Sequence, residues 1–173
     1  MNFYFFKSQR IGEISAIIFL IGIMAVGYYS IASAEFVKVV DGDSLEIGTR
    51  RIRLLGIDAP EYKQYCYDNQ KQKYDCGKEA QRYLKQLLKQ ADFKVSCQKH
   101  KTDRYDRELA VCFANGKNLN LAMIEAGWAV TYRTEKRKYI EAEQRAQKEK
   151  IGVWQGKFMR PEYYRRLHRR KNR

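Results

Sequence analysis

The sequence of 173 residues holds only two histidines and two prolines, and its four cysteines form no C-x-x-C pair. A zinc site therefore lacks its usual ligand spacing, since only His100 and His168 could supply nitrogen ligands. Chemistry based on histidine is poorly supported too, because neither histidine has a partner motif beside it. Acidic residues number 20 against 34 basic ones, a net charge of +14. This excess indicates a polyanionic partner, either nucleic acid or an anionic membrane surface.

The N-terminal part of the chain has the pattern of a targeting segment. Lys7 and Arg10 precede an apolar run, residues 14 to 26, and small residues follow up to Ala34. This order is typical of a signal peptide that is cleaved after Ala34. An uncleaved membrane anchor is the alternative, because the stretch from residue 14 to 34 approaches the length of a membrane span. Either way the rest of the chain is exported: secreted or periplasmic after cleavage, or anchored outside the cytoplasm.

Export makes disulfide bonds the default state of the cysteines. Four cysteines allow three pairings. Cys97 lies near the end of one predicted strand and Cys112 within the next, which favours a bond between these strands. Cys66 and Cys76 would then close the polar loop that precedes the first helix. The sequence does not fix the pairing.

The hydrophobic pattern predicts five short strands and three helices. The strands are expected at residues 36–40, 45–47, 52–57, 93–97 and 109–114, and the helices at 78–90, 119–126 and about 136–150. Helices inserted after the third strand and following the fifth indicate an α+β fold, a five-stranded oligonucleotide-binding (OB) barrel with about three helices. We expect a signal peptide or anchor over residues 1–34, this domain over 35–156 and a basic tail over 157–173.

Side chains suited to metal binding or catalysis concentrate between Val39 and Glu61. Carboxylates stand at predicted strand ends and an arginine lies within a strand: Asp41, Asp43, Asp58, Glu61 and Arg53. Such a cluster at one sheet edge could hold a hard cation and an anion together. Each motif alone has an ordinary structural interpretation, since Asp-Gly is a common hairpin turn and Asp before Ala-Pro ends a strand.

Three motifs in order, D-G-D-S, R-L-L-G-I-D-A-P-E and T-D-R-Y-D-R-E-L-A, resemble the thermonuclease (staphylococcal nuclease-like) family from about Phe36 to Trp154. The resemblance implies the same OB barrel and a Ca²⁺-dependent nuclease. We place Asp43 and Asp58 on the metal, and the resemblance adds the carbonyl of Ala59. Asp41 would support the metal loop from outside, or serve as an ordinary turn aspartate.

The resemblance also implies the catalytic and substrate-binding residues. Glu61 would orient or deprotonate the attacking water, and Arg53 and Arg107 would clamp the phosphate through their guanidinium forks. Tyr105 and Tyr132 match positions that contact a terminal phosphate or stack on a base, although both could be plain surface aromatics. Arg104 is a further candidate for substrate binding, more by general attraction of the polyanion than by a specific contact.

Three residues depart from the family pattern. Ser44 stands in place of a threonine, and Ala59 replaces a threonine found in some members. Asp106 replaces the glycine usual between Tyr105 and Arg107, where a turn with positive φ is expected, so we expect weaker phosphate binding.

The predicted function is an exported, calcium-dependent, nonspecific endonuclease that hydrolyses DNA and/or RNA to 3′-phosphate ends. We expect a monomer whose partner is nucleic acid, single-stranded or frayed, and a membrane contact only if the N-terminal segment is retained. The alternative is a catalytically silent nucleic-acid-binding OB module. The basic tail, from Arg160, is interpreted either as a phosphate-tracking arm or as a solvated helix end.

Overall fold

One sheet carries most of the strands in the computed structural model, which describes residues 35–171. Its order is β1 (Val37–Asp41), β2 (Ser44–Ile47), β3 (Arg50–Leu54), β8 (Glu108–Ala114) and β7 (Ser96–Thr102), and β9 (Lys117–Asn118) also pairs with β8. Neighbours run antiparallel except β3 and β8, which are parallel. The α+β class is confirmed. In the part of the chain that the structure describes, no strand pairing joins β7 to β1, so pairing does not close the expected barrel.

Two of the predicted strands differ from the observed strands by more than one residue at an end. The run expected at residues 52–57 is interrupted at Gly56, and its end forms a separate strand, β4 (Ile57–Asp58). The strand expected at 93–97 begins three residues later, as β7 (Ser96–Thr102). Phe93 has a φ of +56° and belongs to the turn after the preceding helix, so the alternation that begins at Phe93 was misleading.

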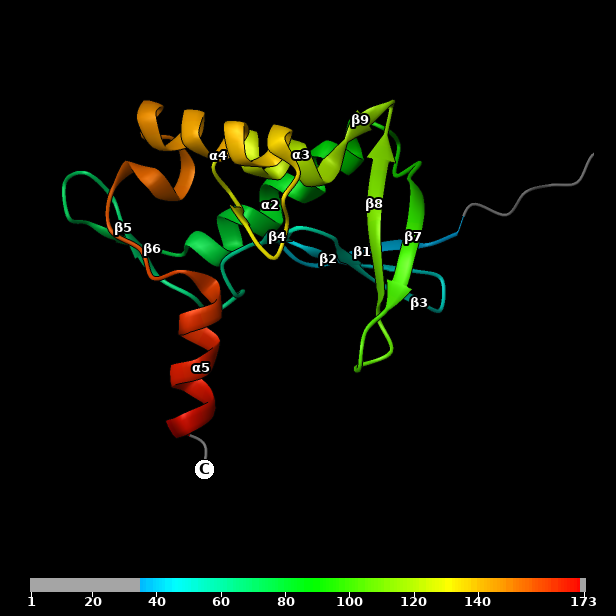
Figure 1. The fold of residues 1–173 in the computed structure, drawn as a ribbon, viewed down its shortest axis with the longest axis horizontal. Coiled ribbons are helices and arrows are strands. Elements are labelled where there is room, and N and C mark those ends of the chain that lie inside the picture. The colour runs from blue at the N-terminus through cyan, green and yellow to red at the C-terminus, as the bar shows by residue number, and fades with distance from the viewer. Residues whose placement is uncertain (1–34, 172–173) are drawn as a thin grey trace, which may run out of the picture. The chain divides into compact units, whose positions relative to one another are not determined.

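Three helices pack together beside the sheet (Figure 1): α2 (Cys76–Lys89), α3 (Leu119–Glu125) and α4 (Arg137–Glu149). All three lie within two residues of the predicted positions. Apolar spacing explains α2, because Ala80, Leu84, Leu87 and Leu88 are its buried residues and recur on one face. They join the inward residues of the strands, such as Leu45, Ile52 and Leu54, in one core.

The C-terminal segment contains a 3-10 helix (Gly152–Gln155) and a fourth α-helix in the described range, α5 (Pro161–Lys171). Pro161 suits the first helical position because it has no N–H to leave unbonded there. The helix α5 extends away from the other helices, on the lower left in Figure 1. The expected tail is therefore helical over most of its length.

Both favoured disulfides are present, Cys66–Cys76 and Cys97–Cys112. Cys97 and Cys112 face each other directly in the pairing of β7 with β8. The first bond ties the start of α2 to the loop before it, which also contains a small hairpin of β5 (Cys66–Tyr67) and β6 (Lys73–Tyr74). Two disulfides are typical of proteins outside the cytoplasm.

The predicted cleavage site at Ala34 and the apolar run before it lie outside the described residues. Within residues 35–171, no helix has both the length and the apolar character needed to cross a membrane.

Candidate active site

The turn between β1 and β2 places Asp43 against the end of β4. A Cβ on Gly42 would lie 2.7 Å from the Cβ atoms of both Ala59 and Ala80, so only glycine allows this close approach. Oδ1 of Asp41 accepts the backbone N–H of Asp43 at 3.1 Å, and Oδ2 of Asp43 accepts the N–H of Ala59 at 3.0 Å. The side chain of Asp41 thus stabilises the turn, and the turn positions the side chain of Asp43 against Ala59.

A second short pairing places Asp58. It lies in β4, opposite Val130 in β10 (Val130–Thr131), and not in the main sheet. Its residue exposure is 1%, and that of Asp43 is 2%. The structure therefore brings together two buried carboxylates from segments that the sequence places at two different strand ends.

Arg53 bridges these two carboxylates from β3. Its Nη1 donates to Oδ1 of Asp43 and its Nη2 to Oδ1 of Asp58, each at 2.6 Å. Burial lowers the pKa of Arg53, but the charges of Asp43 and Asp58 outweigh that effect and raise it. A guanidinium has five N–H donors, so three remain available for another acceptor.

Burial dominates the electrostatics of Asp43. It raises the pKa of this carboxyl from 3.8 to about 6, against the opposing effect of the Arg53 charge. Oδ1 of Asp43 also accepts the hydroxyl of Ser44 at 2.9 Å. Arg53 alone does not balance the charge of two buried carboxylates, so this corner of the protein favours a second cation, either a guanidinium or a metal ion.

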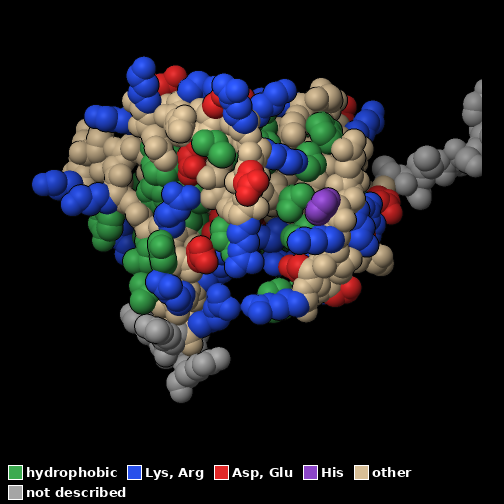
Figure 2. Space-filling model, viewed as in Figure 1, with side chains coloured by type: hydrophobic (Ala, Val, Ile, Leu, Met, Phe, Trp, Pro, Cys, Tyr) green, Lys and Arg blue, Asp and Glu red, His purple; other side chains and the backbone are tan. Residues whose placement is uncertain are grey.

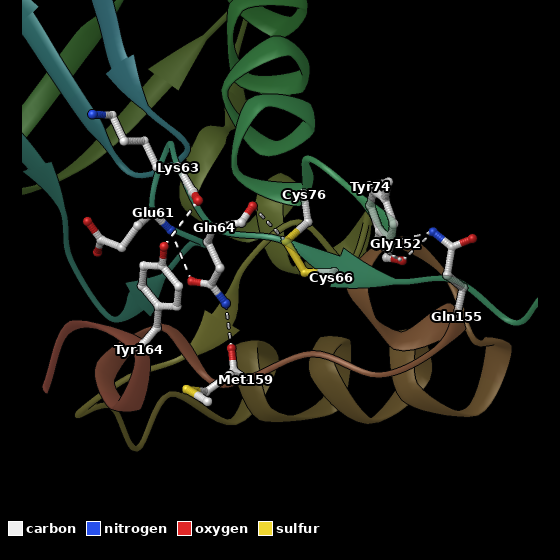
Figure 3. Close-up of a disulfide and its surroundings, with 10 residues drawn as sticks. All are labelled: Glu61, Lys63, Gln64, Cys66, Tyr74, Cys76, Gly152, Gln155, Met159 and Tyr164. Atoms are coloured by element: carbon white, nitrogen blue, oxygen red, sulfur yellow. Dashed lines mark hydrogen bonds between the residues drawn. A yellow bond between two sulfur atoms is a disulfide. The ribbon is translucent and has the colours of Figure 1, made fainter. Parts of the chain in front are cut away.

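Glu61 lies on the loop after β4, and two features fix that loop (Figure 3). A Cβ on Gly77 would come within 1.8 Å of the Glu61 carbonyl oxygen, so α2 can begin here only with glycine. The buried side chain of Gln64 accepts the N–H of Glu61 at 3.3 Å and donates to the carbonyl of Met159 at 2.7 Å. The backbone of Glu61 is thus held by the start of α2 and by the segment before α5.

Arg107 lies at the end of the turn that joins β7 to β8. Its Nε and Nη2 donate to Oδ2 of Asp103 at 2.9 and 2.7 Å. Burial raises the pKa of Asp103, but hydrogen bonds from Arg107 outweigh it and lower that pKa. Asp106 has a φ of +59°, the positive value expected at this position.

Of the remaining predicted substrate residues, Arg104 and Tyr105 lie in the same turn and Tyr132 lies after β10. Tyr105 is half exposed, its hydroxyl accepts Nη2 of Arg104 at 2.7 Å, and the guanidinium of Arg107 lies 5.5 Å from its ring centre. Tyr132 follows β10 and stacks with the guanidinium of Arg133.

A groove of about 870 Å³ joins these elements. Its lining includes six of the predicted site residues, Arg53, Glu61, Arg107, Tyr105, Tyr132 and Arg104, together with Asp41. Figure 2 shows Lys and Arg side chains around a hollow on this face, between α5 and the β7–β8 turn. Asp43 and Asp58 are not part of the lining and lie behind it.

Sequence reasoning missed Arg165 as a site residue. From α5, its Nη1 donates to Oδ1 of Asp58 at 2.8 Å and to Oε1 of Glu61 at 2.7 Å, and its Nη2 donates to Oδ2 of Asp58 at 3.0 Å. Burial lowers the pKa of Arg165, but the hydrogen bonds to Asp58 and Glu61 outweigh it and raise that pKa. In the sequence, Arg165 is one of several arginines in a basic tail, where nothing singles it out.

No set of three or more His, Cys, Asp or Glu side chains within residues 35–171 is arranged to hold a metal ion. A cation in this corner would depend on Asp43, Asp58 and oxygens from backbone, water or substrate.

The comparison with protein families gives a clear result for this chain. Residues 51–156, more than half of its length, match the family described as staphylococcal nuclease homologue. The chain therefore belongs to the staphylococcal nuclease family, as its three motifs predicted, and this membership implies an OB-like fold.

Curated relatives cover a similar region. The chain is 40% identical over 119 residues to the succinoglycan biosynthesis protein ExoI of Rhizobium meliloti. It is 31% identical over 129 residues to an uncharacterized endonuclease of Haemophilus influenzae, and 32% identical over 132 residues to endonuclease YhcR of Bacillus subtilis. These alignments cover 68%, 70% and 68% of the chain, and 62%, 66% and 11% of the relatives. The chain thus matches under two thirds of each relative's length.

Proposed function

We propose that this protein is an exported, calcium-dependent endonuclease that cleaves DNA and/or RNA without sequence preference. The observation that carries the proposal is that Arg53, Glu61 and Arg107, from three separate segments, line one basic groove backed by two buried carboxylates. Two relatives that match this region are named endonucleases. A basic groove lined by arginines and tyrosines fits nonspecific binding of single-stranded or frayed ends.

The residues present fit a calcium ion. Asp43 and Asp58 supply hard carboxylate oxygens, and the guanidiniums of Arg53 and Arg165 already place positive charge on these buried carboxylates, where a cation is stabilised. Asp43 and Asp58, with the carbonyl of Ala59, would hold the ion. When bound, the ion would supply charge compensation at a phosphoryl oxygen and polarise a water.

The chain's own residues account for the other requirements of phosphodiester hydrolysis. Arg53 has three unused donors and Arg107 keeps its Nη1 donors, so both can bind phosphoryl oxygens as charge develops there. Glu61 lines the groove with a side-chain exposure of 32%, where it can accept a proton from water. In-line attack that expels the 5′ oxygen would leave 3′-phosphate ends.

The competing function is a nucleic-acid-binding module without catalysis. Such a module needs the basic surface and the stacking aromatics but has no use for carboxylates buried behind the groove. Burying two carboxylates is costly unless they are paired or bind a cation. Asp43 and Asp58 are paired with Arg53 and Arg165, and their presence behind a groove that Arg53 and Arg107 line is the reason to favour the enzyme.

The test is cleavage of labelled single-stranded and duplex DNA, and of RNA, by the purified, oxidised protein in calcium or in chelator. The double variant Arg53→Ala, Glu61→Ala should bind DNA but lose calcium-dependent cleavage. The control is Arg50→Ala, Glu108→Ala, which removes an ion pair of 2.7 Å between β3, the strand that also carries Arg53, and β8. This pair lies away from the groove lining, and its removal likewise leaves the net charge unchanged. Salt-sensitive binding without cleavage in all three proteins would contradict the enzyme and support the binding module.

A further inference from the structure

The helix α5 attaches to the candidate active site through one charged side chain. Arg165 makes three hydrogen bonds of 2.7 to 3.0 Å, two to Asp58 and one to Glu61. These partners lie 107 and 104 residues earlier in the chain. The contact therefore joins the C-terminal helix to the predicted metal ligand and to the predicted base.

Arg165 leaves little room for another cation at Asp58. Each carboxylate oxygen offers about two acceptor positions. Oδ1 of Asp58 already accepts Arg53 and Arg165, and Oδ2 accepts Arg165, so one position remains. Arg165 also lines the groove, whereas Asp58 is 1% exposed behind it. A divalent cation that binds Asp58 must therefore displace the guanidinium or share one carboxylate with it, and like charges so close repel.

The other attachments of α5 are modest. Along the helix as far as Arg169, Pro161 is buried, Tyr164 and Arg165 are half-buried, and the remaining residues are exposed. The hydroxyl of Tyr164 donates to the carbonyl of Lys63 at 3.1 Å, on the loop that carries Glu61 (Figure 3). The helix can thus leave the groove at small cost once Arg165 is released.

We propose that Arg165 is a displaceable counter-cation: binding of a divalent cation at Asp58 and docking of α5 through Arg165 exclude each other. This inference rests on the proposed cation site at Asp43 and Asp58. Cation binding then releases α5 and opens the groove wall that Arg165 and Arg169 form. By linkage, the cation weakens docking of α5 by the same factor as docking weakens cation binding, so whatever weakens docking strengthens cation binding.

Calcium affinity, measured by isothermal titration of the purified, oxidised protein, tests the exchange. Arg165→Gln should tighten calcium binding on the order of tenfold, within the usual range of coupling between two sites. The matched control is Arg169→Gln, which removes the same charge one turn along the same groove wall. Within residues 35–171, Arg169 bonds to the carbonyl of Arg165 and to no carboxylate. Its calcium affinity should stay within about twofold of the wild type, because screening weakens charges at that distance.

A variant of unchanged charge separates docking from electrostatics. Tyr164→Phe removes only the hydroxyl that bonds to Lys63, and loss of one such hydrogen bond should tighten calcium binding about two- to tenfold. Hydrogen exchange gives the reciprocal measurement: calcium should speed amide exchange within residues 161–171 of the wild type.

The outcomes distinguish the two proposals. Tighter calcium binding in Arg165→Gln and Tyr164→Phe, with faster exchange in α5, supports the inference. Equal affinities in wild type, Arg165→Gln and Arg169→Gln, or calcium that protects α5, would overturn the inference and leave the proposed cation site intact. If neither the wild type nor Arg165→Gln binds calcium, the cation site itself fails, and the inference with it.

Discussion

Burial of Asp43 predicts that the protein loses stability as the pH rises. The folded protein holds the pKa of this carboxyl at about 6, above the value of 3.8 expected when unfolded. Between these two values the folded state binds more protons than the unfolded state, so the free energy of unfolding falls with increasing pH. This loss of stability is absent below the pKa of Asp43 in the unfolded chain and complete above its pKa in the folded protein. Asp43→Asn removes the titration.

The size of the effect follows from the shift. At about 1.36 kcal/mol per pKa unit, the shift from 3.8 to about 6 corresponds to roughly 3 kcal/mol. The pKa values of Asp103 and Glu108 are lowered in the folded protein, so these two groups add stability as the pH rises. Their contribution is complete above pH 4.5, the pKa of Glu108 in the unfolded chain. From about pH 4.5 to 6 the remaining contribution of Asp43 is about 1.5 kcal/mol.

Urea unfolding followed by tryptophan fluorescence can measure this contribution, with chelator present at each pH. Across that interval wild type should lose about 1.5 kcal/mol relative to Asp43→Asn. The control Asp68→Asn removes a carboxylate from a surface loop while keeping the oxygen that accepts the N–H groups of Gln70 and Gln72, and it should follow the wild type. Parallel stability curves for wild type and Asp43→Asn would refute the reasoning.

Three other predictions follow from the site. Asp106→Gly should relieve the positive φ of +59° and raise stability by about 0.5 to 1 kcal/mol, with higher kcat/KM; no gain in either would show that aspartate is tolerated there. Gly77→Ala should displace the Glu61 carbonyl, which lies 1.8 Å from the added Cβ, and reduce cleavage more than it reduces DNA binding; unchanged cleavage would contradict this positioning role. Saturating calcium should stabilise the wild type more at pH 6 than at pH 4.5, since bound calcium favours ionised Asp43, and equal stabilisation would argue against Asp43 as a ligand.

Local sequence signals predicted the elements that hold the site. The Asp-Gly turn, the strand that carries Arg53 and the periodic helix at α2 depend on neighbouring residues, and the structure has each of them near its expected place. The favoured cysteine pairing is the one that the structure contains, because Cys97 and Cys112 lie on adjacent strands. Family motifs then placed the candidate residues, which lie in or directly behind one groove.

Other features depend on contacts that sequence patterns do not show. Most of β7 is exposed on both faces, so it has no apolar alternation, whereas the turn around Phe93 imitates one. The contact of Arg165 with Asp58 joins residues 107 positions apart, and a basic tail gives no sign of which arginine turns inward. Gly77 likewise matters only because α2 meets the Glu61 loop in space.

Single-turnover cleavage of a labelled single-stranded oligonucleotide is the most direct test of the central claim, that this groove hydrolyses phosphodiesters. Wild type and Glu61→Gln are compared at saturating DNA and calcium. Loss of a general base typically lowers a rate by a factor of about 10² to 10⁴. The cleavage rate of Glu61→Gln should therefore be lower than that of the wild type by a factor in this range, while its affinity for DNA equals that of the wild type. Equal cleavage by the two proteins, or none by the wild type, would contradict the claim.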